Sequence, residues 1–168
     1  LRGVRYYFDT VSVTGTANLM MAATLADGET ILENVAKEPE IVFLANILNQ
    51  CGAKIKGHGT DFLIIKGVQS LKPINCDILP DRIETGTYMI ASAITSGNVK
   101  ITNCLPQQVE ALTMKLRQAG LIVEEAERSL RVISNGQFKG VDITTHPHPG
   151  FATDLQAQFM ALMAIAEG

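Results

Sequence analysis

The chain has 168 residues, of which 17 are acidic and 14 are basic, and 46% of them are hydrophobic. This length is enough for one large domain or two small ones with a buried core. The formal net charge of -3 and the 5% of aromatic residues argue against a nucleic-acid or anionic-membrane surface, and no apolar run reaches the ~20 residues of a membrane-spanning helix.

Apolar periodicity and turn residues predict a β-α-β-α-β-β order in the first part of the chain. Thr14-Gly15-Thr16 opens the first helix, and Pro39 in the first turn favours the start of the second. Gly52 ends that second helix, because glycine readily adopts the left-handed conformation that terminates helices. The expected elements are a strand at 1–8, a helix at 17–26, a strand at 30–33, a helix at 38–51, and a hairpin of strands at 53–56 and 62–66.

The same order returns roughly 70 residues later, as an internal repeat. Thr85-Gly86-Thr87 repeats Thr14-Gly15-Thr16, and the run 112–120 repeats the leucine and glycine spacing of 44–52. The expected elements are a helix at 88–95, a strand at 99–103, a helix ending at 120, a hairpin of strands at 122–125 and 130–134, a strand at 141–144 and a last helix after 154.

This order predicts an α/β fold of two complete repeats plus the start of a third. Helical segments 19–25 and 159–165 are apolar on every side, so we expect both to be buried nearly all round. The chain is expected to be an internal fragment, because both ends fall inside a repeat. The boundary between its two halves is expected within 69–81, which contains two prolines.

The stretch from His146 to Gln158, HPHPGFATDLQAQ, is the most unusual in the chain. Two prolines and a glycine restrict the backbone, and Thr153-Asp154 directly precedes a strongly helical run. One interpretation is an ordinary helix N-cap, in which a side-chain oxygen accepts from a free N–H of the first turn. The other is a carboxylate held rigidly at a loop–helix junction, which can act as a general base toward a substrate hydroxyl.

The spacing of the cysteines and histidines does not favour a metal site. The three cysteines, Cys51, Cys76 and Cys104, are far apart in sequence, and we expect all three to be small buried residues in a reducing compartment. Only His146 and His148 have the close spacing of metal ligands, and the prolines beside them favour a structural loop. We therefore expect no metal and no other cofactor.

The repeat and its motifs resemble the enolpyruvyl transferase family. The segments that carry the resemblance are 11–16 and 20–23, VSVTGT and MMAA; 38–42, EPEIV; 79–87, LPDRIETGT; and 148–158, HPGFATDLQAQ. The resemblance implies an inside-out α/β barrel built of β-α-β-α-β-β units, in a longer enzyme with two domains of three repeats each and the substrates between them. Residues 1–78 would then be the later part of one domain, and 79–168 the earlier part of the second.

The resemblance also implies a reaction and its site residues. The enolpyruvyl group of phosphoenolpyruvate passes to the 3-hydroxyl of UDP-N-acetylglucosamine, and phosphate is released in the bacterial cytoplasm. Asp154 is the implied general base and also an implied contact to the substrate. Thr10, Val11, Ser12 and Val13 are the implied contacts to the UDP group. Further candidate contacts are Thr14, Thr153 and Arg82. The implied partners are these two substrates and the remainder of the protein's own chain, with no nucleic acid and no membrane.

The resemblance places the catalytic cysteine and the basic residues that hold phosphoenolpyruvate outside Leu1–Gly168, so these residues alone are expected to be inactive. Two alternatives stay open. The first is the related enzyme that uses shikimate 3-phosphate, whose serine-rich phosphate-binding segment has no counterpart at 12–18. The second is a non-catalytic binding module built from the same repeats.

Overall fold

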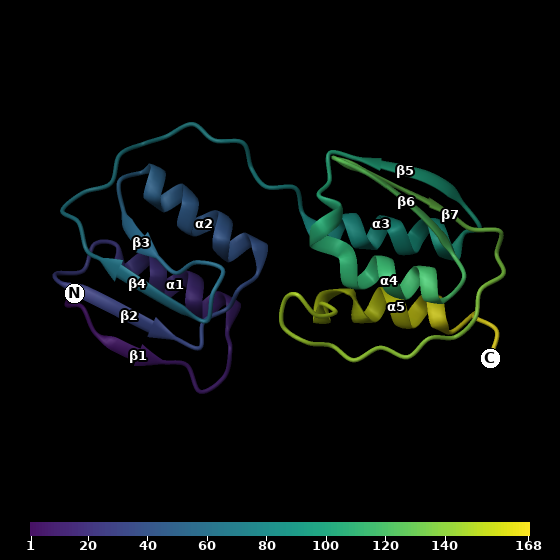
Figure 1. Ribbon diagram of the computed structural model, residues 1–168, viewed down its shortest axis with the longest axis horizontal. Coiled ribbons are helices and arrows are strands. Elements are labelled where there is room, and N and C mark those ends of the chain that lie inside the picture. Colours follow the sequence, from purple (N-terminus) through teal and green to yellow (C-terminus); the bar gives the residue numbers. More distant parts are fainter. The chain divides into compact units, whose positions relative to one another are not determined.

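A computed structural model describes residues 1–168 and divides them into two compact units, Leu1–Leu79 and Pro80–Gly168 (Figure 1). The division falls within 69–81, the stretch in which the sequence predicts a boundary. That the two units belong to different domains of a longer enzyme stays a prediction.

The first unit is a four-stranded sheet with two helices. Its strands lie in the order β1-β2-β4-β3, with β1 parallel to β2 and the other neighbours antiparallel. Alternate strand residues such as Leu32 and Leu63, which face each other across β2 and β4, join Met20 of α1 and Ile41 of α2 in one buried cluster. The elements are β1 (Arg5–Tyr7), α1 (Val13–Ala23), β2 (Glu29–Glu33), α2 (Pro39–Gln50), β3 (Lys54–Lys56) and β4 (Phe62–Lys66).

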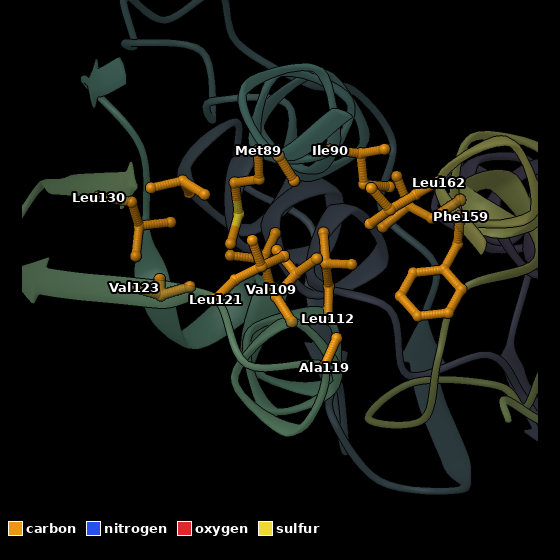
Figure 2. Packing of buried hydrophobic residues seen from close by; sticks show 14 of the residues in the cluster. Met89, Ile90, Val109, Leu112, Ala119, Leu121, Val123, Leu130, Phe159 and Leu162 are labelled. Atoms are coloured by element: carbon orange, nitrogen blue, oxygen red, sulfur yellow. The ribbon is translucent and has the colours of Figure 1, made fainter. Parts of the chain in front are cut away.

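The second unit is a three-stranded antiparallel sheet, ordered β5-β7-β6, with helices α3, α4 and α5 on one side of it (Figure 1). Figure 2 shows the core between these layers, where Met89 and Leu112 of the helices meet Val123 and Leu130 of the strands. The elements are α3 (Arg82–Ile94), β5 (Asn98–Thr102), η1 (Pro106–Val109), α4 (Glu110–Gln118), β6 (Ile122–Ala126), β7 (Ser129–Ile133), η2 (Thr153–Leu155) and α5 (Gln156–Met163).

The repeat predicted from the sequence is confirmed at the level of single backbone angles. Asn34 follows β2 with φ 55°, and Asn103 follows β5 with φ 53°. Gly52 follows α2 with φ 103°, and Gly120 follows α4 with φ 102°. Asparagine and glycine are the residues that enter the left-handed region most easily, so the two units turn with the same chemistry at these two places. Both predicted hairpins are also present.

Two element predictions in the second unit are wrong. Helix α3 begins at Arg82 rather than near Tyr88, because the Asp81 carboxylate accepts hydrogen bonds from the N–H groups of Ile83 (2.7 Å) and Glu84 (3.2 Å) and so caps an earlier start. Residues 141–144 form no strand, since no neighbouring strand pairs with them and the only bridges nearby are isolated ones at 139 and 145.

The prediction that two helical segments are buried nearly all round is also wrong. In the 19–25 segment, Leu19 is 38% and Leu25 is 55% exposed, and in the 159–165 segment Met160 is 65% and Ile165 is 59% exposed. Each of the two helices packs on one side only, and the exposed side of α1 helps to line an apolar groove of about 350 Å³ beside β1. None of the helices has the length and apolar character needed to cross a membrane.

The cysteines differ in accessibility, so the expectation that all three are buried is wrong for two of them. Cys104 is buried, Cys51 is half-buried and Cys76 is exposed. Cys104 lies directly after the left-handed Asn103, where the chain turns inward toward the core, whereas Cys76 lies outside any helix or strand. Burial raises the pKa of the Cys104 thiol, which lowers its fraction of reactive thiolate.

We predict that iodoacetamide modifies Cys76 well before Cys104 in the folded protein. The reason is that Cys104 is both shielded and held in the neutral thiol form. Mass spectrometry of a labelling time course measures the two rates, and urea should bring them together. Equal rates for Cys76 and Cys104 without urea would contradict the packing described for the second unit.

Candidate substrate-binding and catalytic residues

The first group of candidate residues, Thr10–Thr14, leads into α1 and includes its first two residues. The helix begins at Val13, and Ser12 is its N-cap with φ -132° and ψ 117°. The Ser12 hydroxyl accepts a hydrogen bond from the Gly15 N–H at 3.0 Å. The N–H groups of Val13 and Thr14 precede this bond and have no acceptor within the helix, as is general for a first helical turn. The segment therefore offers backbone donors to an anion.

Apolar side chains anchor this segment and leave its polar groups near the surface. Val11 and Val13 are half-buried and pack against the core of the first unit, whereas Thr10 and Thr14 are exposed. None of the residues from 8 to 18 is basic. Within this segment, the groups available to an anionic ligand are N–H and hydroxyl groups.

The second group includes Asp154, which lies in the short 3-10 turn η2 immediately before α5. Neither η2 nor α5 has a side-chain cap hydrogen bond, so the interpretation of Thr153 or Asp154 as a helix N-cap is wrong. The turn is instead closed by the backbone, with the Leu155 N–H donating to the Ala152 carbonyl at 3.1 Å. Both Thr153 and Asp154 are exposed.

Buried aromatic and aliphatic residues fix the junction on both sides of Asp154. Phe151 is 5% exposed and makes an edge-on contact with Phe159, with ring centroids 5.3 Å apart. Leu155 is 3% exposed and belongs to the core. On α5, the Gln158 amide donates to the Thr87 hydroxyl of α3 at 3.1 Å. An exposed carboxylate thus lies between two buried side chains on an element that is tied to α3.

The loop before this junction is also closed on itself. The His146 N–H donates to the Phe151 carbonyl at 3.0 Å, and the Gly150 N–H donates to the Pro147 carbonyl at 2.8 Å. Gly150 has no room for a side chain, since a Cβ there would lie 2.5 Å from the His146 Cβ. This tight loop brings Phe151 to the core and sets the direction in which the chain enters η2. No group of three or more His, Cys, Asp or Glu side chains is placed to hold a metal ion.

Arg82, the remaining candidate, is the first residue of α3 and is half-buried. Helix α3 packs against both η2 and α5, so Arg82 and Asp154 belong to neighbouring elements of the same unit. Sequence reasoning missed the cap that positions Arg82, although the spacing of Asp81 and Glu84 is that of a capping box and was a usable signal. It also missed the contact between Gln158 and Thr87, because these residues are far apart in the sequence and no local pattern predicts that they meet.

Two surface hollows lie apart from the candidate residues. One, of about 590 Å³, lies over β5, β6 and β7 and is lined by polar residues including Lys100, Glu124 and Arg131. The other is the apolar groove beside α1 and β1, lined by residues such as Tyr6 and Leu19. Neither is lined by Thr10–Thr14, Arg82 or Asp154.

Comparison with known proteins identifies the family. The family model described as EPSP synthase (3-phosphoshikimate 1-carboxyvinyltransferase) matches residues 1–168. The UDP-N-acetylglucosamine 1-carboxyvinyltransferase of Bdellovibrio bacteriovorus is 57% identical over 168 residues, and that of Nitratidesulfovibrio vulgaris is 55% identical over 169 residues. Each alignment covers 100% of this chain and 41% or 40% of the relative. The chain belongs to the EPSP synthase family of enolpyruvyl transferases, and it spans about 40% of the length of these relatives.

Solved structures agree on the fold. The enolpyruvyl transferase NikO from Streptomyces tendae matches with a TM-score of 0.79 at 22% sequence identity, covering 92% of this chain and 38% of that one. EPSP synthase from Acinetobacter baumannii matches with a TM-score of 0.61 at 19% identity, covering 86% and 34%. The predicted α/β fold class is confirmed.

We predict that replacing Ser12 by alanine destabilises the first unit. The Ser12→Ala variant loses the cap of α1, which costs about 1 kcal/mol in the free energy of unfolding. Ser12→Asp is the matched control, because aspartate is an equally good N-cap. Urea unfolding of the full-length protein measures both. A Ser12→Ala protein as stable as the unchanged one would show that the hydrogen bond to Gly15 contributes nothing.

Proposed function

We propose that the full-length protein transfers the enolpyruvyl group of phosphoenolpyruvate to the 3-hydroxyl of UDP-N-acetylglucosamine and releases phosphate. The observation that carries the proposal is the exposed Asp154 carboxylate, held at the η2–α5 junction by buried neighbours and not used as a helix cap. Relatives named UDP-N-acetylglucosamine 1-carboxyvinyltransferase are 52–57% identical to this chain over essentially its whole length. This similarity supports UDP-N-acetylglucosamine as the acceptor.

In this proposal Asp154 accepts the proton of the sugar 3-hydroxyl while the oxygen of that hydroxyl attacks C2 of phosphoenolpyruvate. A proton is added to the methylene carbon C3 in the same addition. Elimination then breaks the bond from C2 to the phosphate oxygen, and loss of a proton from C3 restores the vinyl double bond. A general base within hydrogen-bond reach typically accelerates such a step by about 10²- to 10⁴-fold.

The start of α1 is the proposed contact to the UDP group. Thr10, Val11, Ser12 and Val13 would offer backbone N–H groups near the positive end of the helix dipole, where a phosphate is stabilised. The exposed hydroxyl of Thr14 is a further donor. Because no basic side chain lies between 8 and 18, we assign this contact to the backbone more than to side chains.

Thr153 and Arg82 complete the proposed set in the second unit. Thr153 directly precedes Asp154 and is exposed, so its hydroxyl would contact the sugar beside the base. Arg82 begins α3, against which η2 packs, and its guanidinium would favour an anionic part of the substrates.

The remaining catalytic groups are proposed to lie outside these 168 residues. The family resemblance assigns the proton donor to a cysteine in a motif that none of Cys51, Cys76 and Cys104 occupies. The basic residues that hold phosphoenolpyruvate are assigned outside the chain as well. Without those groups most of the electrostatic stabilisation of the transition state is lost, so we propose that the 168 residues alone have no activity.

The proposed role of the full-length protein is the first committed step of peptidoglycan synthesis in the bacterial cytoplasm, which serves cell-wall biogenesis and with it cell shape and division. The bacterial sources of the named relatives support this. Shikimate 3-phosphate is the second candidate acceptor, because the matching family model carries the name of the enzyme that uses it.

We predict that the full-length protein releases phosphate from phosphoenolpyruvate with UDP-N-acetylglucosamine and not with shikimate 3-phosphate. Asp154→Asn should lower kcat by at least about 10²-fold, since the amide cannot accept the proton. A colorimetric phosphate assay measures both. Asp142→Asn, an identical change at another exposed carboxylate of the second unit, is the matched control and should leave kcat unchanged.

Each other outcome has a distinct meaning. Phosphate release with shikimate 3-phosphate alone would contradict the proposed acceptor. An Asp154→Asn protein as active as the unchanged one would contradict the proposed base. No release with either acceptor would leave a binding module built from these repeats.

A further inference from the structure

Gly86 occupies a position in α3 where a side chain does not fit. It is buried inside the helix, where glycine is disfavoured relative to alanine because it has more conformational freedom to lose. A Cβ atom at Gly86 would lie 2.8 Å from both Cδ atoms of Leu155 and 3.1 Å from a Cδ atom of Leu112. Ordinary carbon–carbon contacts are about 3.5–4.0 Å, so Leu155 reaches the backbone of α3 only because Gly86 lacks a side chain.

Leu155 is the residue directly after Asp154 in the same 3-10 turn. It is 3% exposed, whereas Asp154 is exposed. Because the turn is short and closed by a backbone hydrogen bond from Leu155 to Ala152, the depth at which Leu155 packs sets the position of the Asp154 backbone, from which the carboxylate extends. Leu112 of α4 fills the space on another side of the Gly86 position, which limits how far Leu155 can shift within the core.

A second contact, made by α5, ties the same segment to α3 next to the first. The Gln158 amide of α5 donates to the Thr87 hydroxyl at 3.1 Å, and that hydroxyl donates to the Ile83 carbonyl at 2.8 Å. Thr87 is the neighbour of Gly86 in sequence. The Gly86–Leu155 contact and the Thr87–Gln158 hydrogen bond therefore fix the η2–α5 segment to α3 at two adjacent points.

The repeat gives an independent parallel in the first unit. Gly15 is the middle residue of Thr14-Gly15-Thr16, as Gly86 is of Thr85-Gly86-Thr87. A Cβ at Gly15 would lie 2.9 Å from Phe8 Cε1 and 2.9 Å from the Ser12 hydroxyl oxygen. In both units, a side chain packs onto the middle glycine from a segment that carries candidate site residues.

We propose that Gly86 is a positioning residue for the transfer reaction, because its missing side chain sets the place of Leu155 and through it the place of the Asp154 carboxylate. This inference rests on the proposed function, in which Asp154 takes the proton. Proton transfer requires heavy atoms within about 2.6–3.2 Å of each other. Restoring an ordinary contact from 2.8 Å requires the Leu155 Cδ atoms to move by on the order of 1 Å. Because Leu112 occupies another side of the same space, we infer that the movement passes to the backbone of η2, where a misplacement of about 1 Å costs about 10²-fold in rate.

The test is the Gly86→Ala variant of the full-length protein. We expect kcat for phosphate release to fall by about 10²-fold, with KM for UDP-N-acetylglucosamine changed by less than about threefold. Leu155→Val removes both clashing Cδ atoms, so the double variant Gly86→Ala/Leu155→Val should recover most of the lost kcat. Ala91→Gly, the reverse exchange at an exposed position of α3, should reduce stability without lowering kcat.

Three results would overturn the inference while leaving the base role of Asp154 intact. They are an unchanged kcat in Gly86→Ala, a raised KM at unchanged kcat, or a loss that Leu155→Val does not reverse, including a failure of the double variant to fold. If Asp154→Asn is as active as the unchanged protein, the proposed function fails instead. A crystal structure of Gly86→Ala shows directly whether residues 153–155 have moved relative to α3, and unmoved residues would overturn the inference whether or not Asp154 is the base.

Discussion

Asp154 is held in place by its buried neighbours rather than by a capping bond of its own. Phe151 on one side and Leu155 on the other are both core residues, and Asp154 lies between them at the surface. An exposed side chain keeps its orientation at low entropic cost only when the backbone beneath it cannot move. The Phe151–Phe159 contact, the packing of Leu155 on Gly86 and the Gln158–Thr87 hydrogen bond supply that restraint.

The two units use the same framework for different purposes. In the first, the segment that packs onto Gly15 provides the cap and the first turn of α1, which suit an anion. In the second, the residue that packs onto Gly86 is Leu155 of η2, far along the chain. Its neighbour in sequence, Asp154, provides the carboxylate. In each unit, a glycine in the first two turns of a helix thus leaves room for a second segment to pack against it. That segment is close in sequence in the first unit and distant in the second, and its residues determine which chemical groups lie at the site.

Much of the fold could be predicted from the sequence, because its signals are local. Strands show alternating apolar and polar residues, and glycines mark the turns between neighbouring elements. The hairpins and the turns at Gly52 and Gly120 are of this kind. The exposed sides of α1 and α5 could not be predicted, since a helix that is apolar all round gives no sign of how many neighbours cover it. For the site, the position of Asp154 at a loop–helix junction followed from its sequence, whereas the Gly86–Leu155 contact joins residues far apart in the chain and needed the structure.

The proposed role of Asp154 is tested by the affinity of the Asp154→Asn protein for UDP-N-acetylglucosamine, measured by titration calorimetry on the full-length protein. A base that acts on the hydroxyl during the transfer contributes to the transition state and little to the bound ground state. We therefore predict a dissociation constant within about threefold of that of the unchanged protein. A dissociation constant weakened by about 10²-fold or more would show that Asp154 acts chiefly by holding the sugar in the ground state, and would contradict a contribution made mainly in the transition state.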